Sequence, residues 1–121
     1  MADDLTNLRL SSNATAVADD LLQTGFFDDR VSIVKLGFSY AINRYYGKFN
    51  PPEYEKTLDS DGLNYNVGSL DGDKSMAILV KTLYPECTTP YRYARAIICY
   101  GLGKLADLNA RGELFPIYEI L

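Results

Sequence analysis

Hydrophobic and polar residues alternate at the start of the chain. Leu8 and Leu10 fall on one face of an extended segment over residues 5–10, while Asn7 and Arg9 fall on the other. Alternation of this kind is typical of a short strand with one buried face. We therefore expect a strand whose polar face is open to solvent.

The spacing then changes to a helical one. Over residues 13–24 the apolar positions recur at every third or fourth residue, which predicts a first helix. Ser12 and Asn13 are suitable N-caps for it, and Gly25 suits a left-handed C-cap. One strand and short helices cannot close a core alone. This unit is therefore expected to pack on a copy of itself or on the rest of the chain.

The second helical pattern is the most apolar part of the sequence. It begins after the capping pair Asp28-Asp29 and runs to about Tyr46. Its apolar residues cover nearly the whole circumference, as in a central helix or one that a partner buries. Gly37 lies inside it at a propensity cost of about 1 kcal/mol, which predicts a close crossing with another helix.

The second half contains a turn-rich segment and two more helical patterns. Residues 49–73 predict an ordered excursion with an acidic turn and a short strand around Tyr65. Asp71 is a candidate N-cap for a third helix over residues 73–84. Thr89, followed by Pro90 at the permitted first position, predicts the start of a long fourth helix.

These patterns predict a mainly α single domain over residues 1–121, with a short N-terminal strand and about four helices. Residues 1–48 form a strand–helix–helix unit, and residues 74–121 a helical pair with an apolar tail. We expect the tail to pack back on the domain or on another subunit. No apolar run approaches a membrane span, and the acidic start lacks the features of a signal peptide, so the expected location is the cytoplasm.

Composition argues against an enzyme. The chain has no His, which removes the commonest general base. Cys87 and Cys99 are expected to be reduced thiols. The pairs Asp59-x-Asp61 and Asp71-x-Asp73 lack the further ligands of a calcium loop, so turn or cap roles are expected. We expect neither a metal nor another cofactor, and we expect the ten tyrosines to fill the core and an interface.

The order strand–helix–helix resembles ribbon-helix-helix DNA-binding proteins. In them two antiparallel strands enter the major groove, which would give Asn7 and Arg9 contacts with base edges. The chain carries a net charge of −4, and Asp28-Asp29 lies where such proteins bring a helix start to phosphate. An operator-binding repressor or antitoxin is therefore an alternative rather than the first hypothesis.

The chain as a whole resembles the DndE family of bacterial DNA phosphorothioation (sulfur modification) systems over about residues 5 to 110. The motifs are Leu8-Arg9-Leu10-Ser11, Thr24-Gly25, a second helix of the Val34 to Ala41 type, the segment Asp59 to Gly68, Leu83-Tyr84-Pro85, and a last helix with Gly101-Leu102 and Leu105. The resemblance implies a mainly helical homo-oligomer that works beside cysteine desulfurase, iron–sulfur and ATPase components. It also implies binding of duplex DNA, notably nicked DNA, through surface lysines, for which only Lys35 and Lys48 match.

The first hypothesis is thus a non-enzymatic, oligomeric accessory protein of a DNA phosphorothioation or defence system, in contact with DNA. The alternative is a protein–protein scaffold with no nucleic-acid role. The candidates for nucleic-acid contact are Asn7, Arg9, Lys35, Arg44 and Lys48. The candidates for an oligomer interface are Leu8, Leu10, Val34, Phe38 and Ile42. Convergence of the basic residues on one face would favour the first hypothesis, and interleaved acids the scaffold.

Overall fold

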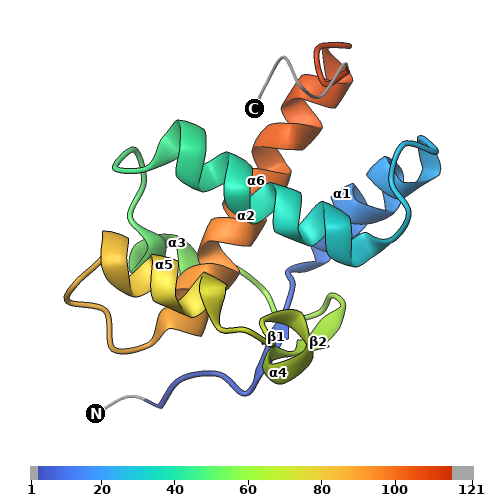
Figure 1. Cartoon of the computed structure of the whole chain (residues 1–121). Helices are drawn as coiled ribbons and strands as arrows, with labels where there is room; N and C mark the ends of the chain where they lie inside the picture. The colour runs from blue at the N-terminus through green and yellow to red at the C-terminus, as the bar shows by residue number, and fades with distance from the viewer. Residues whose placement is uncertain (1–2, 116–121) are drawn as a thin grey trace.

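The computed structural model describes residues 3–115, which contain two short strands and six helices (Figure 1). In chain order the elements are β1 (Asn7–Arg9), α1 (Ser12–Gln23), α2 (Arg30–Tyr45), α3 (Pro51–Glu55), β2 (Asn64–Asn66), α4 (Val67–Leu70), α5 (Ser75–Leu83) and α6 (Pro90–Ala110). The predicted mainly α class with a short N-terminal strand is confirmed. The four predicted helices are present, and the excursion adds two short ones, α3 and α4.

Helix α6 runs through the middle of the molecule, and α1, α2, α3 and α5 all pack on it (Figure 1). Its side chains are buried on nearly every side between Ala94 and Leu102. The closest crossing is with α2, where Gly37 lies against Gly101 with no room for a Cβ atom on Gly101. The close crossing predicted from Gly37 is confirmed, because two glycines let the helix backbones meet.

The sheet forms within the chain. Strands β1 and β2 are antiparallel, with Leu8 opposite Tyr65 and Arg9 opposite Asn64. The pairing continues beyond the strands, where the Leu10 amide donates to the Leu63 carbonyl at 2.8 Å. This is unlike a ribbon-helix-helix dimer, in which the strand pairs with its copy in another subunit.

Four of the five residues predicted for an oligomer interface lie in the core instead. Leu8, Leu10 and Val34 are fully buried, and Phe38 is nearly so. These apolar positions are satisfied by packing inside one chain, so the fold leaves them no surface to offer a second subunit. Only Ile42 is partly exposed.

The caps differ in detail from the predictions. Helix α1 is capped by Ser11, whose hydroxyl accepts the Ala14 amide at 3.0 Å, rather than by Ser12 or Asn13. Asp29 caps α2 as predicted, accepting the Ser32 amide at 2.8 Å.

The side-chain caps of the two later helices do not come from the residue directly before each helix. Asp71 lies outside α5, yet its carboxylate accepts the amides of Met76 and Ala77 at 2.9 and 3.1 Å. Thr89 is the N-cap residue of α6 and Pro90 its first residue, as predicted, but the Thr89 side chain makes no capping hydrogen bond. Asp4 takes that role from the N-terminal segment, accepting the amides of Tyr91 and Arg92 at 3.0 and 3.1 Å.

The described part of the apolar tail packs back on the domain. Leu114 is buried, and Phe115 stacks on Phe26 with ring centroids 4.3 Å apart. The remainder of the predicted tail, residues 116–121, lies outside the described residues. Between residues 3 and 115, no helix combines the length and hydrophobicity needed to cross a bilayer.

Candidate nucleic-acid interface

An open cavity of about 350 Å³ lies beside β1. Its lining comes from four parts of the fold. These are β1 and the residue Leu5 before it, α3, β2 with the segment that leads into it, and the first turns of α6. The remaining lining residues are Asn7 and Arg9, Glu55, Ser60 and Asn64, and Arg92 and Arg95, in the same order. The β1–β2 register leaves Asn7 and Arg9 exposed while Leu8 points into the core. The cavity thus joins two predicted DNA-contact residues to two arginines that the sequence analysis did not select.

Arg95 is the buried centre of this site, with 5% of its surface exposed. Its Nε donates to the Arg9 carbonyl at 2.6 Å, and its Nη1 donates to Glu55 Oε2 at 2.9 Å. Its Nη2 donates to the Asp59 carbonyl and to Ser60 Oγ. A buried guanidinium needs this many partners because its desolvation is costly. Arg95 therefore ties β1, α3 and the loop before β2 to α6, and positions the outer arginines.

Arg9 and Arg92 form the outer part of the cavity. The Arg9 Nη1 donates to the Gly62 carbonyl at 3.0 Å. The Arg92 Nε donates to the Asp3 carbonyl at 3.2 Å, and its Nη1 lies 3.6 Å from Glu55 Oε1. A guanidinium has five N–H donors, so both side chains keep donors for a ligand. Three arginines and one glutamate leave the lining with a surplus of positive charge.

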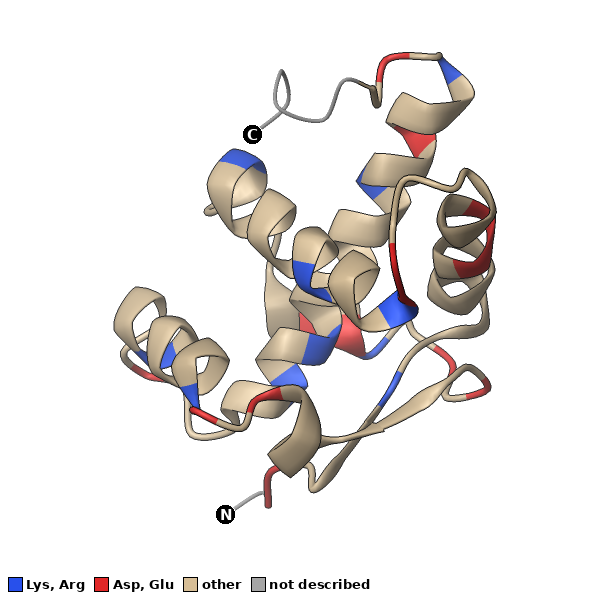
Figure 2. Ribbon diagram, turned by 45° about the vertical axis from the view of Figure 1, so that its right-hand side comes forward, with Lys and Arg blue, Asp and Glu red and all other residues tan. Residues whose placement is uncertain are grey.

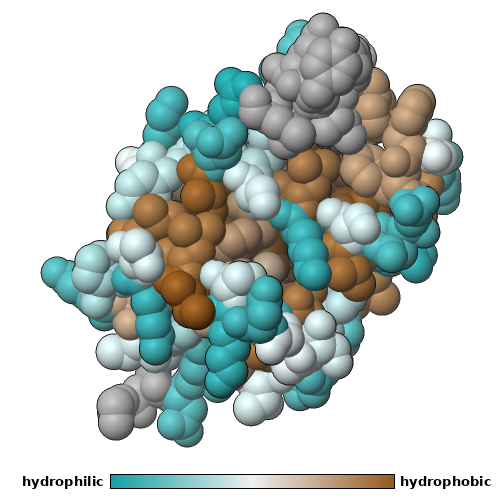
Figure 3. Space-filling view, in the orientation of Figure 1, coloured by the Kyte–Doolittle hydropathy of each residue, from teal (hydrophilic) through white to brown (hydrophobic). Residues whose placement is uncertain are grey.

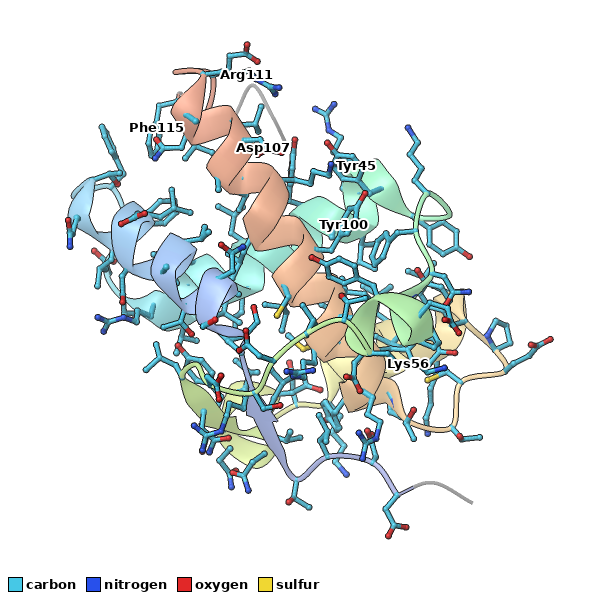
Figure 4. The ribbon with its side chains drawn as sticks, turned by 180° about the vertical axis from the view of Figure 1, so that it is seen from behind. Tyr45, Lys56, Tyr100, Asp107, Arg111 and Phe115 are labelled. Atoms are coloured by element: carbon cyan, nitrogen blue, oxygen red, sulfur yellow. The ribbon has the colours of Figure 1, made fainter. Side chains whose placement is uncertain are left out.

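The basic surface extends a short way towards α3. Lys56 and Arg92 line an adjoining cavity of about 150 Å³, with Glu55 between the two sites. Figure 4 shows Lys56 beside the start of α6, far from Arg111 at the other end of that helix. Lys56 also pairs with Glu53 at 3.3 Å, so its charge is partly compensated.

Two aspartates near the site are already hydrogen-bonded within the fold. Asp59 accepts the amide and hydroxyl of Ser12, both at 2.7 Å, and these bonds lower the pKa of Asp59 below its usual value. Asp4 accepts the amides of Tyr91 and Arg92 at the start of α6.

The start of α2, a predicted phosphate position, lies elsewhere. There, hydrogen bonds from Ser32 lower the pKa of Asp29. That helix start is closed by its own carboxylate and is unsuited to a phosphate.

The other basic candidates do not join the site. Lys35 lines a separate cavity between α2 and α5, and Arg44 lies in the last turn of α2. Lys48 follows that helix. Figure 2 shows Lys and Arg segments spread over several elements with Asp and Glu segments between them. The structure therefore brings together Asn7 and Arg9 but not Lys35, Arg44 and Lys48.

The two cysteines are buried, and Asp59 and Asp71 of the acidic pairs bind backbone amides. Cys87 and Cys99 are buried and unpaired with each other, and burial raises the pKa of both thiols. Asp59 and Asp71 cap backbone amides, as the turn and cap interpretation predicts. Within residues 3–115 no three His, Cys, Asp or Glu side chains are grouped so that they could hold a metal.

Tyrosines and a phenylalanine form an aromatic cluster around α6. The Phe49 ring lies parallel to Tyr100 with centroids 3.9 Å apart, and Tyr45 and Tyr54 meet Tyr100 edge-on at 5.5 and 5.3 Å. The Lys104 ammonium lies 5.4 Å from the ring centres of both Tyr45 and Tyr100. Figure 4 shows Tyr45 and Tyr100 close to each other beside α6, near the end of α2. Their faces are occupied by this cluster rather than offered to bases.

Comparison of the chain with protein-family models, with curated proteins and with solved structures gave no match.

Proposed function

We propose that this protein is a non-enzymatic, oligomeric accessory protein of a DNA phosphorothioation or related defence system in the cytoplasm. In this proposal it contacts the phosphate backbone of duplex or nicked DNA through the cavity beside β1. The observation that carries the proposal is the convergence of Arg9, Arg92 and Arg95 with two asparagines in that one open cavity. The resemblance to the DndE family supplies the pathway and its other subunits as partners.

Phosphate suits this cavity for two reasons. Guanidinium groups bind phosphate oxygens through paired N–H donors, and Arg9 and Arg92 keep such donors free. Asn7 and Asn64 add amide groups at the rim, joined by a hydrogen bond of 3.2 Å. Such contacts position a backbone without reading sequence, which fits binding by shape better than operator recognition.

The absence of enzymatic activity is part of the proposal. It is supported by the lack of His in the sequence and by the burial of both thiols. A thiol acts as a nucleophile in its deprotonated form, and burial raises the pKa of both Cys87 and Cys99. No activated nucleophile is therefore provided by either cysteine.

The test is fluorescence anisotropy with labelled intact and nicked duplexes over a salt series. Two phosphate contacts predict a slope of about −2 for log K against log salt. The double variant Arg9→Ala/Arg92→Ala should lose most of the affinity. The matched control Arg30→Ala/Arg111→Ala removes the same charge from pairs with Asp19 and Glu113, and should bind nearly as the parent does.

Two results would contradict the DNA proposal. One is the absence of binding at low salt by a folded, oligomeric sample. The other is an equal loss in both double variants, which would mean that net charge alone governs binding. Either result favours the scaffold alternative, which already gains support from the interleaved charges in Figure 2. The repressor alternative would require β1 to pair between chains, whereas β1 pairs with β2.

A further inference from the structure

Helix α5 carries apolar side chains on both of its faces. Met76 and Val80 are buried on the side that packs on α6. On the outer side, Ile78 is 61% exposed and Leu79 is 38% exposed. Within residues 3–115 they are the only large aliphatic side chains with this much exposure. A surface helix normally carries polar residues there, so the outer face of α5 has the character of a contact surface.

This face continues into a cavity. About 460 Å³ of space lies between α2 and α5, two helices that both pack on α6. Phe38, Leu70 and Met76 give it an apolar floor, and Leu79 stands on its wall. Figure 3 shows apolar surface gathered over α2 and α5 with hydrophilic side chains around it. We call this cavity, together with the exposed Ile78 that precedes Leu79 on α5, the α2–α5 groove.

The charges around the α2–α5 groove indicate what kind of partner would fit. Lys74, Ile78 and Lys81 follow one another at helical spacing, so two ammonium groups flank the exposed isoleucine. Lys35 lies on the opposite wall, on α2.

The carboxylates in the groove are already engaged. Asp71 is buried and holds two amides and the Tyr91 hydroxyl. Asp73 accepts the Ser75 amide at 3.0 Å and also attracts Lys35, and the pKa of Asp73 is lowered chiefly by the hydrogen bonds from Ser75. Both carboxylates keep their charge, but Lys35, Lys74 and Lys81 outnumber these two aspartates by one. The charge left for a partner is therefore positive, and it lies mainly on Lys74 and Lys81 beside Ile78.

A second copy of the chain fits this surface poorly. An antiparallel contact centred on Ile78 would place Lys81 of one copy beside Lys74 of the other, and like charges in such a position repel. We infer that the α2–α5 groove is the docking site for an acidic amphipathic segment of a partner protein. Its apolar side chains would enter over Phe38, Met76 and Leu79, and its carboxylates would meet the lysines.

This inference is independent of the proposed DNA contact. The α2–α5 groove shares no lining residue with the cavity beside β1. Loss of one activity therefore leaves the other measurable. The variant Arg9→Ala/Arg92→Ala should bind the partner segment as the parent does.

The probe is a labelled synthetic amphipathic helix with leucine on one face and glutamate on the other, compared with the same peptide carrying lysine for glutamate. We expect the glutamate peptide to bind at least about tenfold more tightly. Ile78→Asp should weaken its binding at least about tenfold, and Lys35→Glu/Lys81→Glu should reverse the preference. Phe26→Asp, a matched change at an exposed apolar residue of the α1–α2 corner, should leave peptide binding unchanged. Because it removes the ring contact with Phe115, circular dichroism should verify that this variant is folded.

Ile78 is exposed, so its variant should keep the parent's thermal unfolding curve, which circular dichroism can verify. Absence of binding by both peptides would overturn the inference. Equal affinity for both peptides, or an Ile78→Asp variant that binds unchanged, would overturn it too. Light scattering that shows a dimer dissociated by Ile78→Asp would assign the face to a second copy instead.

Discussion

Replacing Gly101 with alanine tests the packing at the centre of the fold. A Cβ atom on Gly101 would overlap the carbonyl oxygen of Gly37 and lie 2.7 Å from its carbonyl carbon. Carbon atoms pack at about 3.5–4.0 Å, so α2 and α6 would have to separate by about 1 Å. The obstacle is backbone, which has no rotamer into which it can move.

The expected loss follows from two opposing effects. Overpacking of a tight core costs about 3 kcal/mol at the upper end of its usual range, and alanine returns about 1 kcal/mol of helix propensity. Gly101→Ala should therefore lower the free energy of unfolding by about 2 kcal/mol. Gly103→Ala meets nothing within 4 Å and should raise it by about 0.5–1 kcal/mol. Gly37→Ala meets the Leu102 side chain at 2.9 Å and should lie between these two.

The assay is urea unfolding of the parent and the three variants, followed by circular dichroism. For a chain of this length, a loss of about 2 kcal/mol would also lower the midpoint of thermal unfolding by about 8 °C. Gly103→Ala should be the most stable of the four proteins and Gly101→Ala the least stable. The parent and Gly37→Ala should lie between them. A Gly101→Ala protein within about 0.5 kcal/mol of the parent would refute the crossing described for α2 and α6.

Three smaller predictions concern single side chains. Asp4→Ala should lower the free energy of unfolding by about 1 kcal/mol, measured in urea, because Tyr91 and Arg92 lose the acceptor of their amides. Tyr84→Phe should be as stable as the parent or up to about 1 kcal/mol more stable, because the buried hydroxyl has no hydrogen-bond partner among the described residues. Burial, with the hydrogen bond to Asp71, raises the pKa of Tyr91 to about 12. Its contribution to stability is therefore complete below pH 10 and is lost as the pH rises towards 12. Urea titrations at both ends of that range should show a shallower decline for Tyr91→Phe.

The elements of this fold were largely predictable because their signals are local. The alternation around Leu8 and Leu10 predicted the buried face of β1, and Asp29 predicted the start of α2. Gly37 gave the close crossing, although its partner Gly101 is far away in the chain. The predicted interface at Val34 was misplaced because a very apolar helix looks the same whether its own chain or another subunit covers it.

The parts that escaped prediction depend on contacts between distant residues. Asp4 caps a helix that begins near residue 90, so no local pattern marks it, and Thr89 was the better local candidate. Arg95 lies off the apolar stripe of α6 and looks like a surface residue. Its burial becomes acceptable because Glu55 and three other acceptors from distant segments meet it.

The proposed DNA contact lies in the cavity beside β1. The most direct measurement is the amide NMR spectrum of the labelled protein titrated with a short nicked duplex at low salt. Contact at this cavity should shift the amide signals of β1, β2 and the first turn of α6, and these shifts should weaken together as salt is added. Shifts confined to the end of α2 around Lys48, or no shifts at any amide, would contradict it.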